Sequence, residues 1–208
     1  MTHSPFYALL LRMKYISRWG LMRSSIPENL SEHSLETAVI AHALAVIDNT
    51  YLGGAARPEH IACAALFHDA AEILTGDLPT PVKYNNPAIR QAYRSVEDAA
   101  RESLLAALPQ PLQPVYRPLL FCEDLSPADY RYIKAADKIC AYLKCVEEHK
   151  SGNREFESAS QQLQQAIASF RLPAADYFME HFAPAFSLTL DEQENGTASA
   201  IPSKSCKN

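Results

Sequence analysis

The chain has 208 residues, of which 48% are hydrophobic and 21% are charged, a balance typical of one folded domain with a sizeable core. Its net charge of −5 provides no basic surface of the kind that nucleic-acid polymers require, although a bound cation would still let it hold a small anion. Only six glycines occur, and none forms the glycine-rich phosphate loop of Rossmann or P-loop proteins.

The N-terminal segment has neither the pattern of a secretory signal nor that of a membrane anchor. Its apolar run, residues 6–11, is short, and the basic residues follow it rather than precede it. No stretch approaches the roughly 20 apolar residues of a membrane span. The five cysteines form no CxxC pair, and their odd count argues against a disulfide framework. We therefore expect a cytoplasmic protein with reduced, mostly buried thiols.

Helical periodicity dominates from the start of the chain. Residues 6–13, and the segment that begins near Ser31, carry apolar side chains at helical spacing. Asn29 and, three residues later, Glu32 form a capping pair for the second of these helices. The periodicity of this helix places His42 in the core. Its apolar stripe comprises Leu35, Ala38, Val39, His42, Ala45 and Val46.

The rest of the chain is also predicted to be helical. A third helix begins at Pro58 and ends at Gly76, a natural C-terminal cap, and the proline-containing segment 76–87 is expected to be a loop. Further helices are expected over residues 88–108, 126–148, 153–170 and 176–182, with a break over residues 109–118. Residues 191–208 lack apolar periodicity, so we expect no regular structure there. The sequence thus predicts an all-α fold with one domain over residues 1–190.

His68 and Asp69 stand side by side in the middle of the apolar third helix. Such a pair costs several kcal/mol when buried, unless its members are paired or bind a metal. Glu72 follows Asp69 by three residues and therefore shares its helix face. On these residues alone two interpretations stay open, a metal site or a buried His–Asp hydrogen bond with Glu72 at the surface.

Two further positions favour the metal site. His33 lies near the start of the second helix, and Asp137 lies among small and apolar residues in the segment 131–148. Two imidazoles and two carboxylates on three helices suit a divalent cation such as Mn²⁺, Co²⁺, Fe²⁺ or Zn²⁺.

His33, then His68–Asp69, then Asp137 match the H…HD…D signature of the HD phosphohydrolase superfamily. The segments SRWGLMR, ENLSEHSLE, HDAAEILTGDLPTPVKY and KAADKICAYLKCVEE resemble the bacterial HD-domain 5′-deoxynucleotidases, and the resemblance covers roughly residues 6–190. It implies an HD-type helical bundle, a homodimer, and 2′-deoxyribonucleoside 5′-monophosphates as substrates. Binuclear HD enzymes carry extra histidines between the HD pair and the final aspartate. None occurs here, so we expect one divalent metal ion, such as cobalt or manganese.

Glu72 and Arg18 are the expected catalytic residues. Glu72 is the best candidate to position or deprotonate the attacking water, the alternative being that it orients His68. A guanidinium is the natural partner of a phosphate, but without the resemblance Arg18 would be interpreted as a surface charge. The resemblance places Arg18 and Trp19 at the substrate and the segment 77–80 against its sugar and base. The residues assigned to substrate binding are Arg18, Trp19, Asp69, Asp77, Leu78, Pro79, Thr80 and Asp137.

Two other functions fit part of this pattern. An HD phosphohydrolase could act on another nucleotide, such as a guanosine polyphosphate or a deoxynucleoside triphosphate, and its products would differ. A non-catalytic HD module could bind a nucleotide as a sensor, but a sensor has no need of the water-activating acid Glu72. A purely structural helical protein leaves four buried polar groups unexplained.

Overall fold

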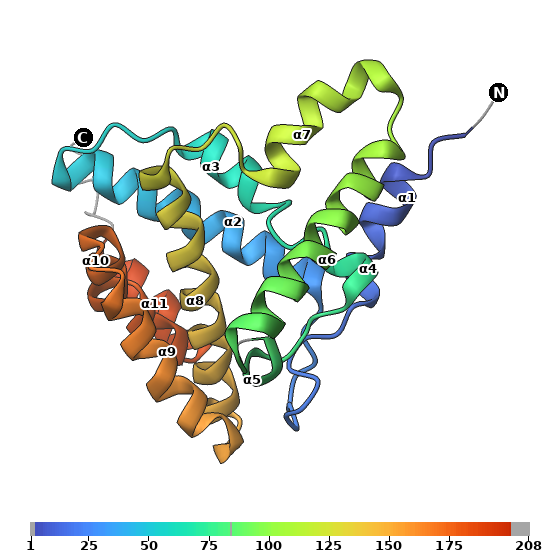
Figure 1. The fold of residues 1–208 in the computed structure, drawn as a ribbon. Helices are drawn as coiled ribbons and strands as arrows, with labels where there is room; N and C mark the ends of the chain where they lie inside the picture. The colour runs from blue at the N-terminus through green and yellow to red at the C-terminus, as the bar shows by residue number, and fades with distance from the viewer. Residues whose placement is uncertain (1–2, 84, 201–208) are drawn as a thin grey trace.

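The computed structural model describes residues 3–83 and 85–200, and it is an assembly of helices (Figure 1). Within these residues there is no strand, only an isolated antiparallel bridge between Ser17 and Asn29. The predicted all-α class is confirmed. In chain order the helices are α1 Phe6–Leu10, η1 Leu11–Tyr15, α2 Leu30–Ile47, η2 Asp48–Leu52, α3 Pro58–Ala65, α4 Glu72–Thr75, α5 Thr80–Lys83, α6 Pro87–Ala106, η3 Gln110–Leu112, α7 Gln113–Phe121, α8 Pro127–Lys150, η4 Arg154–Phe156, α9 Glu157–Ser169, α10 Pro173–His181, η5 Ala183–Ser187 and α11 Leu190–Ala200.

Helix α2 runs through the middle of the molecule and packs against both α3 and α8 (Figure 1). The side chains between these helices form the main hydrophobic core, in which Leu44, Ile61, Ile133 and Ile139 are fully buried. His33 lies on the buried face of α2 and is itself completely buried. Because α8 crosses this face, donors from α2 and α8 can meet inside the protein.

A second, smaller core lies between α1, α6 and α7, where Phe6, Leu104 and Leu120 pack together. The chain passes from the first core to the second between Ala65 and Ala70, each of which is buried in one of the two. The HD pair therefore lies on the segment that connects the two cores.

The predicted continuous helix from Pro58 to Gly76 is wrong at this segment, because α3 ends at Ala65 and α4 begins at Glu72. The backbone between them makes tight turns, in which the N–H of His68 donates to the carbonyl of Ala65 at 3.3 Å. The Nδ1 atom of His68 lies 2.7 Å from the same carbonyl oxygen. This side-chain hydrogen bond uses the carbonyl of Ala65, which would otherwise accept a bond within a continuous helix. The helix can therefore break at His68, whose ring faces inward.

The predicted helix starts are confirmed where a side chain caps them. Asn29 Oδ1 accepts from the backbone N–H groups of Ser31 and Glu32, and Glu32 Oε2 accepts in return from Asn29 N at 3.1 Å. This reciprocal capping box fixes the start of α2 three residues before His33. Ser126 Oγ caps α8 in the same way, accepting from Asp129 N at 3.0 Å.

Three segments that were expected to be irregular contain helices. The segment 76–87 holds α5, and the segment 109–118 holds η3 and the first part of α7. Proline fits the first turn of a helix, where its missing N–H has no partner to lose, so Pro111 and Pro114 lie in the first turns of η3 and α7, whereas Pro118 lies inside α7. Residues 191–200 belong to α11, whose start is capped by Thr189 and Glu192. Residues 201–208 lie outside the described residues.

The apolar stripe predicted on α2 faces solvent over part of its length. Leu35 and Val39 are 58% and 59% exposed, and they line a groove of about 440 Å³ between α2 and α8. His42, expected in the core, is only half-buried. The buried face carries the polar residues His33 and Thr37 among apolar residues such as Ala41 and Leu44. Within the predicted stripe Ala38 and Ala45 are buried as expected, whereas Leu35, Val39 and Val46 are exposed, because α3 and α8 pack against another face of α2.

The four cysteines within residues 3–83 and 85–200 are free, and Cys140 and Cys145 are buried as expected, whereas Cys63 is exposed. Among the helices of the same residues, none combines the length and apolar character needed to cross a membrane.

Candidate metal centre and active site

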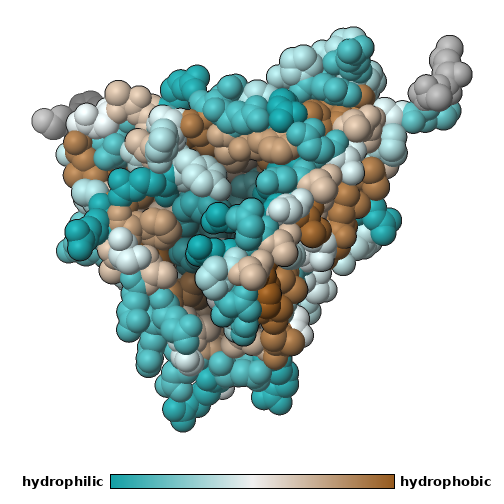
Figure 2. Space-filling view, in the orientation of Figure 1, coloured by the Kyte–Doolittle hydropathy of each residue, from teal (hydrophilic) through white to brown (hydrophobic). Residues whose placement is uncertain are grey.

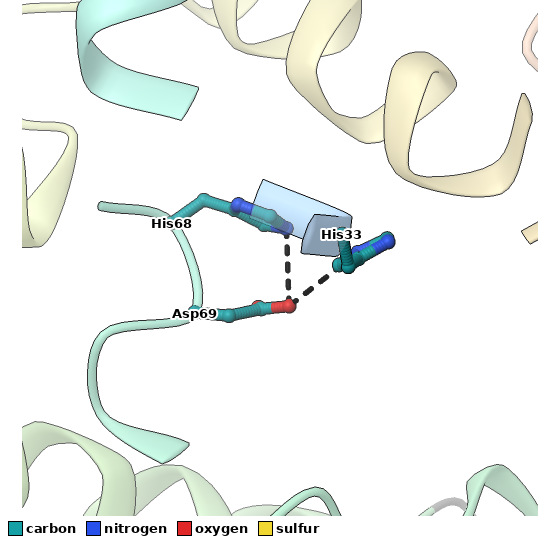
Figure 3. A group of neighbouring side chains, drawn as sticks. All are labelled: His33, His68 and Asp69. Atoms are coloured by element: carbon teal, nitrogen blue, oxygen red, sulfur yellow. Dashed lines mark ion pairs between the residues drawn. The ribbon is translucent and has the colours of Figure 1, made fainter. Parts of the chain in front are cut away.

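Three of the predicted metal donors converge, as Figure 3 shows. Asp69 Oδ2 lies 3.1 Å from His68 Nε2 and 3.7 Å from His33 Nε2, and one donor atom from each of the three residues lies within 4.8 Å of the others. Asp137 on α8 adds a fourth group, since its Oδ1 atom lies 3.2 Å from His33 Nε2. The structure thus brings together all four residues that the sequence assigned to the metal.

The imidazole of His68 is oriented for ligation. A carbonyl oxygen can only accept, so the Nδ1 atom of His68 must be the protonated one in its 2.7 Å contact with Ala65. This leaves a lone pair on Nε2, which is buried and has no hydrogen-bond partner. An unpaired buried acceptor is costly, and a metal ion would satisfy it. With Asp69 and Asp137 beside it, the donor set of two nitrogens and two carboxylates fits a divalent transition metal.

The charges at this centre are negative. Burial alone would raise the pKa of Asp69, but the neighbouring His68 imidazole lowers it below its usual range. The pKa of Asp137 is likewise lowered, against the effect of burial, chiefly by Lys138 and His33. Burial would depress the pKa of His68, but the Asp69 carboxylate outweighs burial and raises it. Two ionised carboxylates make the centre attractive to a cation, which would displace the proton that they favour on His68.

Glu72, the first residue of α4, is 5% exposed. Its Oε2 atom has no hydrogen-bond partner, and its Oε1 atom lies 3.7 Å from the Nζ atom of Lys83. Lys83 in turn donates to Glu97 on α6 at 2.7 Å. Burial, followed by the charges of Asp69 and Asp77, raises the pKa of Glu72 to about 9. No local pattern indicated the part played by Lys83 and Glu97, because both are ordinary charged residues outside the HD signature.

Arg18 lies beside the same centre. Its Nη1 atom is 3.8 Å from Asp69 Oδ2, and its side chain is only 11% exposed. Its Nε atom donates to Glu28 at 2.9 Å, and the indole of Trp19 donates to the other oxygen of Glu28 at 2.7 Å. The interpretation of Arg18 as a solvated surface charge is therefore excluded. Glu28 is a further residue that the sequence analysis missed.

The segment after α4, residues 76–80, forms another part of the candidate site. Gly76 turns the chain with a φ of +74°, a conformation that favours glycine, and its carbonyl accepts from the Tyr93 hydroxyl at 3.2 Å. Asp77 is half-buried, and burial raises its pKa against the opposing charge of Arg18. Leu78 and Pro79 are half-buried too, whereas the side chain of Thr80 lies outside the described part of the chain.

The surface view is consistent with an open site. In Figure 2 the face turned toward the viewer is hollowed near its centre, and hydrophilic side chains gather around the hollow. In the same orientation Figure 1 shows α2 behind this region, with α8 and α6 on either side of it.

Comparison with known proteins identifies the family. Residues 5–186 match the family described as "5′-deoxynucleotidase YfbR-like". The chain belongs to this family. A 5′-deoxynucleotidase of Vibrio parahaemolyticus is 50% identical over 192 residues, which are 92% of this chain and 99% of the relative. A 5′-deoxynucleotidase of Erwinia tasmaniensis is also 50% identical, over 92% of this chain and 97% of its own length.

Solved structures show the same fold at lower sequence identity. An HD-domain phosphohydrolase of Listeria innocua aligns with a TM-score of 0.77 at 21% identity, covering 94% of this chain and 98% of that one. The HD phosphohydrolase of cyanophage S-2L, solved with dA and one catalytic Zn²⁺ ion, aligns with a TM-score of 0.61 at 22% identity, covering 91% and 99%. The predicted HD-type helical bundle is thereby confirmed.

Proposed function

We propose that this member of the 5′-deoxynucleotidase family hydrolyses 2′-deoxyribonucleoside 5′-monophosphates to deoxynucleosides and inorganic phosphate, with one divalent metal ion held by His33, His68, Asp69 and Asp137. The convergence of the imidazole and carboxylate donors carries the proposal. Relatives that are 50% identical over 92% of the chain, and are named 5′-deoxynucleotidases, supply the substrate class.

Each group around the centre has a role in this reaction. A divalent cation in such a site supplies positive charge that polarises a phosphate ester and makes water more acidic. Arg18 binds the non-bridging phosphate oxygens. The positive charge of a bound cation would lower the pKa of Glu72 from its metal-free value, so that its carboxylate can position the attacking water and accept its proton. Lys83 holds one oxygen of Glu72, so the other stays free to face the water. Asp77 accepts a hydrogen bond from the 3′-hydroxyl of the sugar.

The substrate class is tested with a panel of nucleotides. Purified, chelator-treated protein is supplied with Co²⁺, Mn²⁺, Mg²⁺ or Zn²⁺. It is offered deoxyribo- and ribonucleoside monophosphates with the phosphate at the 5′ or the 3′ position, and also a guanosine polyphosphate and a deoxynucleoside triphosphate. We expect inorganic phosphate from the 5′-deoxynucleotides at the highest kcat/KM. Pyrophosphate or tripolyphosphate released from larger nucleotides, with none of the monophosphates hydrolysed, would contradict the proposal. The homodimer implied by the resemblance stays a prediction, which light scattering of the same sample tests.

Replacing Arg18 with lysine should lower kcat/KM by on the order of 10-fold or more, although the positive charge is kept. Lysine is a point charge and cannot present two parallel N–H groups to a phosphate while it also satisfies Glu28. The measurement is the steady-state rate with a 5′-deoxynucleotide, with the exposed Arg154→Lys as the matched control. An Arg18→Lys protein with the kcat/KM of the wild type would exclude a bidentate contact between Arg18 and the phosphate.

Replacing Asp77 with alanine should weaken substrate use and narrow the preference for deoxyribose over ribose. Asp77 stands just past the glycine turn that ends α4, and it is followed by Pro79 and by Pro81 in α5, which restrict the backbone. We expect this restricted segment to exclude a 2′-hydroxyl. The measurement is kcat/KM for paired deoxy- and ribonucleotides with both proteins. If the deoxy-to-ribo ratio and the activity both stay unchanged, Asp77 has no place in the sugar site.

A further inference from the structure

Glu28 stands outside the HD signature, yet its carboxylate touches three residues of the site. Its side chain is only 10% exposed. One oxygen, Oε1, accepts from Arg18 Nε at 2.9 Å, and the other, Oε2, accepts from Trp19 Nε1 at 2.7 Å. Oε1 also lies 3.5 Å from Nδ1 of His33. A buried carboxylate with both oxygens directed at functional side chains acts on their geometry.

The backbone brings these residues together independently of the carboxylate. The N–H of Arg18 donates to the carbonyl of Glu28 at 3.0 Å, and the N–H of Leu30 donates to the carbonyl of Ile16 at 2.9 Å. These bonds form the antiparallel bridge between Ser17 and Asn29. Glu28 therefore faces Arg18 across a short two-stranded contact immediately before α2 begins.

The contact with Glu28 explains how Trp19 keeps an unfavourable backbone conformation. Trp19 has a φ of +59°, which bulky residues rarely adopt. Two contacts hold its indole in place, the hydrogen bond to Glu28 and an edge-to-face contact with Phe156 at 5.1 Å between ring centroids. A backbone strain of this kind persists only where the surroundings fix the residue.

His33 needs an acceptor for its second ring nitrogen. Its Nε2 atom faces Asp137 at 3.2 Å, and its Nδ1 atom is buried without a hydrogen-bond partner. Imidazoles that bind metals usually donate from the other nitrogen to a carboxylate or a carbonyl. His68 uses the carbonyl of Ala65 for this purpose, and the Glu28 carboxylate lies where it can serve His33.

We propose that Glu28 is a positioning residue that aligns the metal-facing imidazole of His33, the phosphate-facing guanidinium of Arg18 and the indole of Trp19 at once. Because Glu28 occupies the Nε side of Arg18, the Nη groups stay free for a phosphate, and Nη1 already points toward Asp69 at 3.8 Å. The inference rests on the proposed function only in assigning a phosphate to Arg18. The alignment of the three side chains stands on the contacts themselves.

The test is the Glu28→Gln variant of the full chain. Glutamine has the same size, but its NH₂ group cannot accept, so either Arg18 Nε or Trp19 Nε1 loses its acceptor. Trp19 is the only tryptophan, so intrinsic fluorescence reports this one side chain. We expect a shifted emission maximum and stronger quenching by acrylamide. We also expect Co²⁺ affinity to fall by about 10–100-fold, as for other residues that support a metal-binding imidazole, and KM for a 5′-deoxynucleotide to rise more than kcat falls.

Glu32→Gln is the matched control, because it removes the same charge from the same helix start and glutamine keeps the capping box. It should match the wild type in emission, quenching and Co²⁺ affinity. If Glu28→Gln loses its helical circular dichroism, Glu28→Asp is tested in its place. The shorter aspartate cannot reach both Arg18 Nε and Trp19 Nε1, so we expect the same changes in emission, quenching and Co²⁺ affinity.

A folded Glu28→Gln protein with the emission, quenching and Co²⁺ affinity of the wild type would overturn the inference, as would a change confined to its melting temperature. A wild-type protein that releases no phosphate from any 5′-deoxynucleotide would overturn the proposed function instead. The fluorescence and Co²⁺ measurements would still decide the role of Glu28 in that case.

Discussion

Replacing Asp137 with alanine should abolish both metal retention and phosphate release. Asp137 supplies the carboxylate from α8, 3.2 Å from His33 Nε2, and its lowered pKa keeps it ionised at neutral pH. Without it, the centre loses a ligand and half of its buried carboxylate charge. We expect Co²⁺ affinity to fall by more than the roughly 10–100-fold typical of residues that only support a ligand. His68→Ala should behave in the same way, because Nε2 of His68 is buried, has no hydrogen-bond partner and is available to bind a metal.

The measurements are metal content after dialysis and phosphate release with metal added back. Asp124→Ala is a suitable control, since Asp124 is exposed and lies just before α8, away from the donors. The control should retain metal and activity. If the Asp137→Ala protein kept full metal occupancy and normal turnover, the ligand assignment would be wrong.

Replacing Glu72 with glutamine or alanine should lower kcat by ~10²–10⁴-fold, the usual contribution of a general acid–base group, while the metal stays bound. Glu72 is not among the four donors, and its Oε2 atom is free of other partners. Co²⁺ affinity and kcat measured on the same samples separate the two effects. Near-normal kcat in Glu72→Gln would reduce Glu72 to a residue that orients its neighbours.

The stability of the metal-free protein gives a second test of Glu72. Burial raises its pKa to about 9 in the folded chain, above the ordinary value of 4.5 that applies when it is unfolded. The folded state therefore binds the extra proton, and its stability declines as the pH rises between these two values. Glutamine cannot ionise, so Glu72→Gln should melt at a higher temperature than the wild type, by a margin that grows from about pH 5 to about pH 8. A margin that shrinks with rising pH would contradict this account.

Local signals in the sequence determined much of the helical framework. The capping pair at Asn29 and Glu32 and the cap at Ser126 fixed the starts of α2 and α8, because each depends on hydrogen bonds among four consecutive residues. The H…HD…D order likewise identified the donors before their positions were known, since an imidazole and a carboxylate among apolar residues need a partner. The convergence of His33, His68, Asp69 and Asp137 agrees with that expectation.

Contacts between helices, not local sequence, set which face of α2 is buried and where the predicted third helix breaks. Leu35 and Val39 follow the hydrophobic period yet lie exposed, because α3 and α8 pack against another face of α2, which carries His33, Ala41 and Leu44. The break between α3 and α4 depends on where His68 must point, since its ring binds the carbonyl that a continued helix would use. Both outcomes depend on contacts with other helices, which no local pattern encodes.

The residues that hold Arg18 and Glu72 in place could not be recognised from local sequence patterns. The composition, the caps and the metal-binding signature can be recognised from neighbours along the chain. Glu28 and Lys83 are ordinary charged residues in sequence, and their roles arise from the ion pairs with Arg18 and Glu72. Those pairs exist because the chain folds back, with segment 16–18 beside segment 28–30 and α5 beside α6. A helix cap is set by a few adjacent residues, whereas a buried ion pair requires the whole fold to bring its partners together.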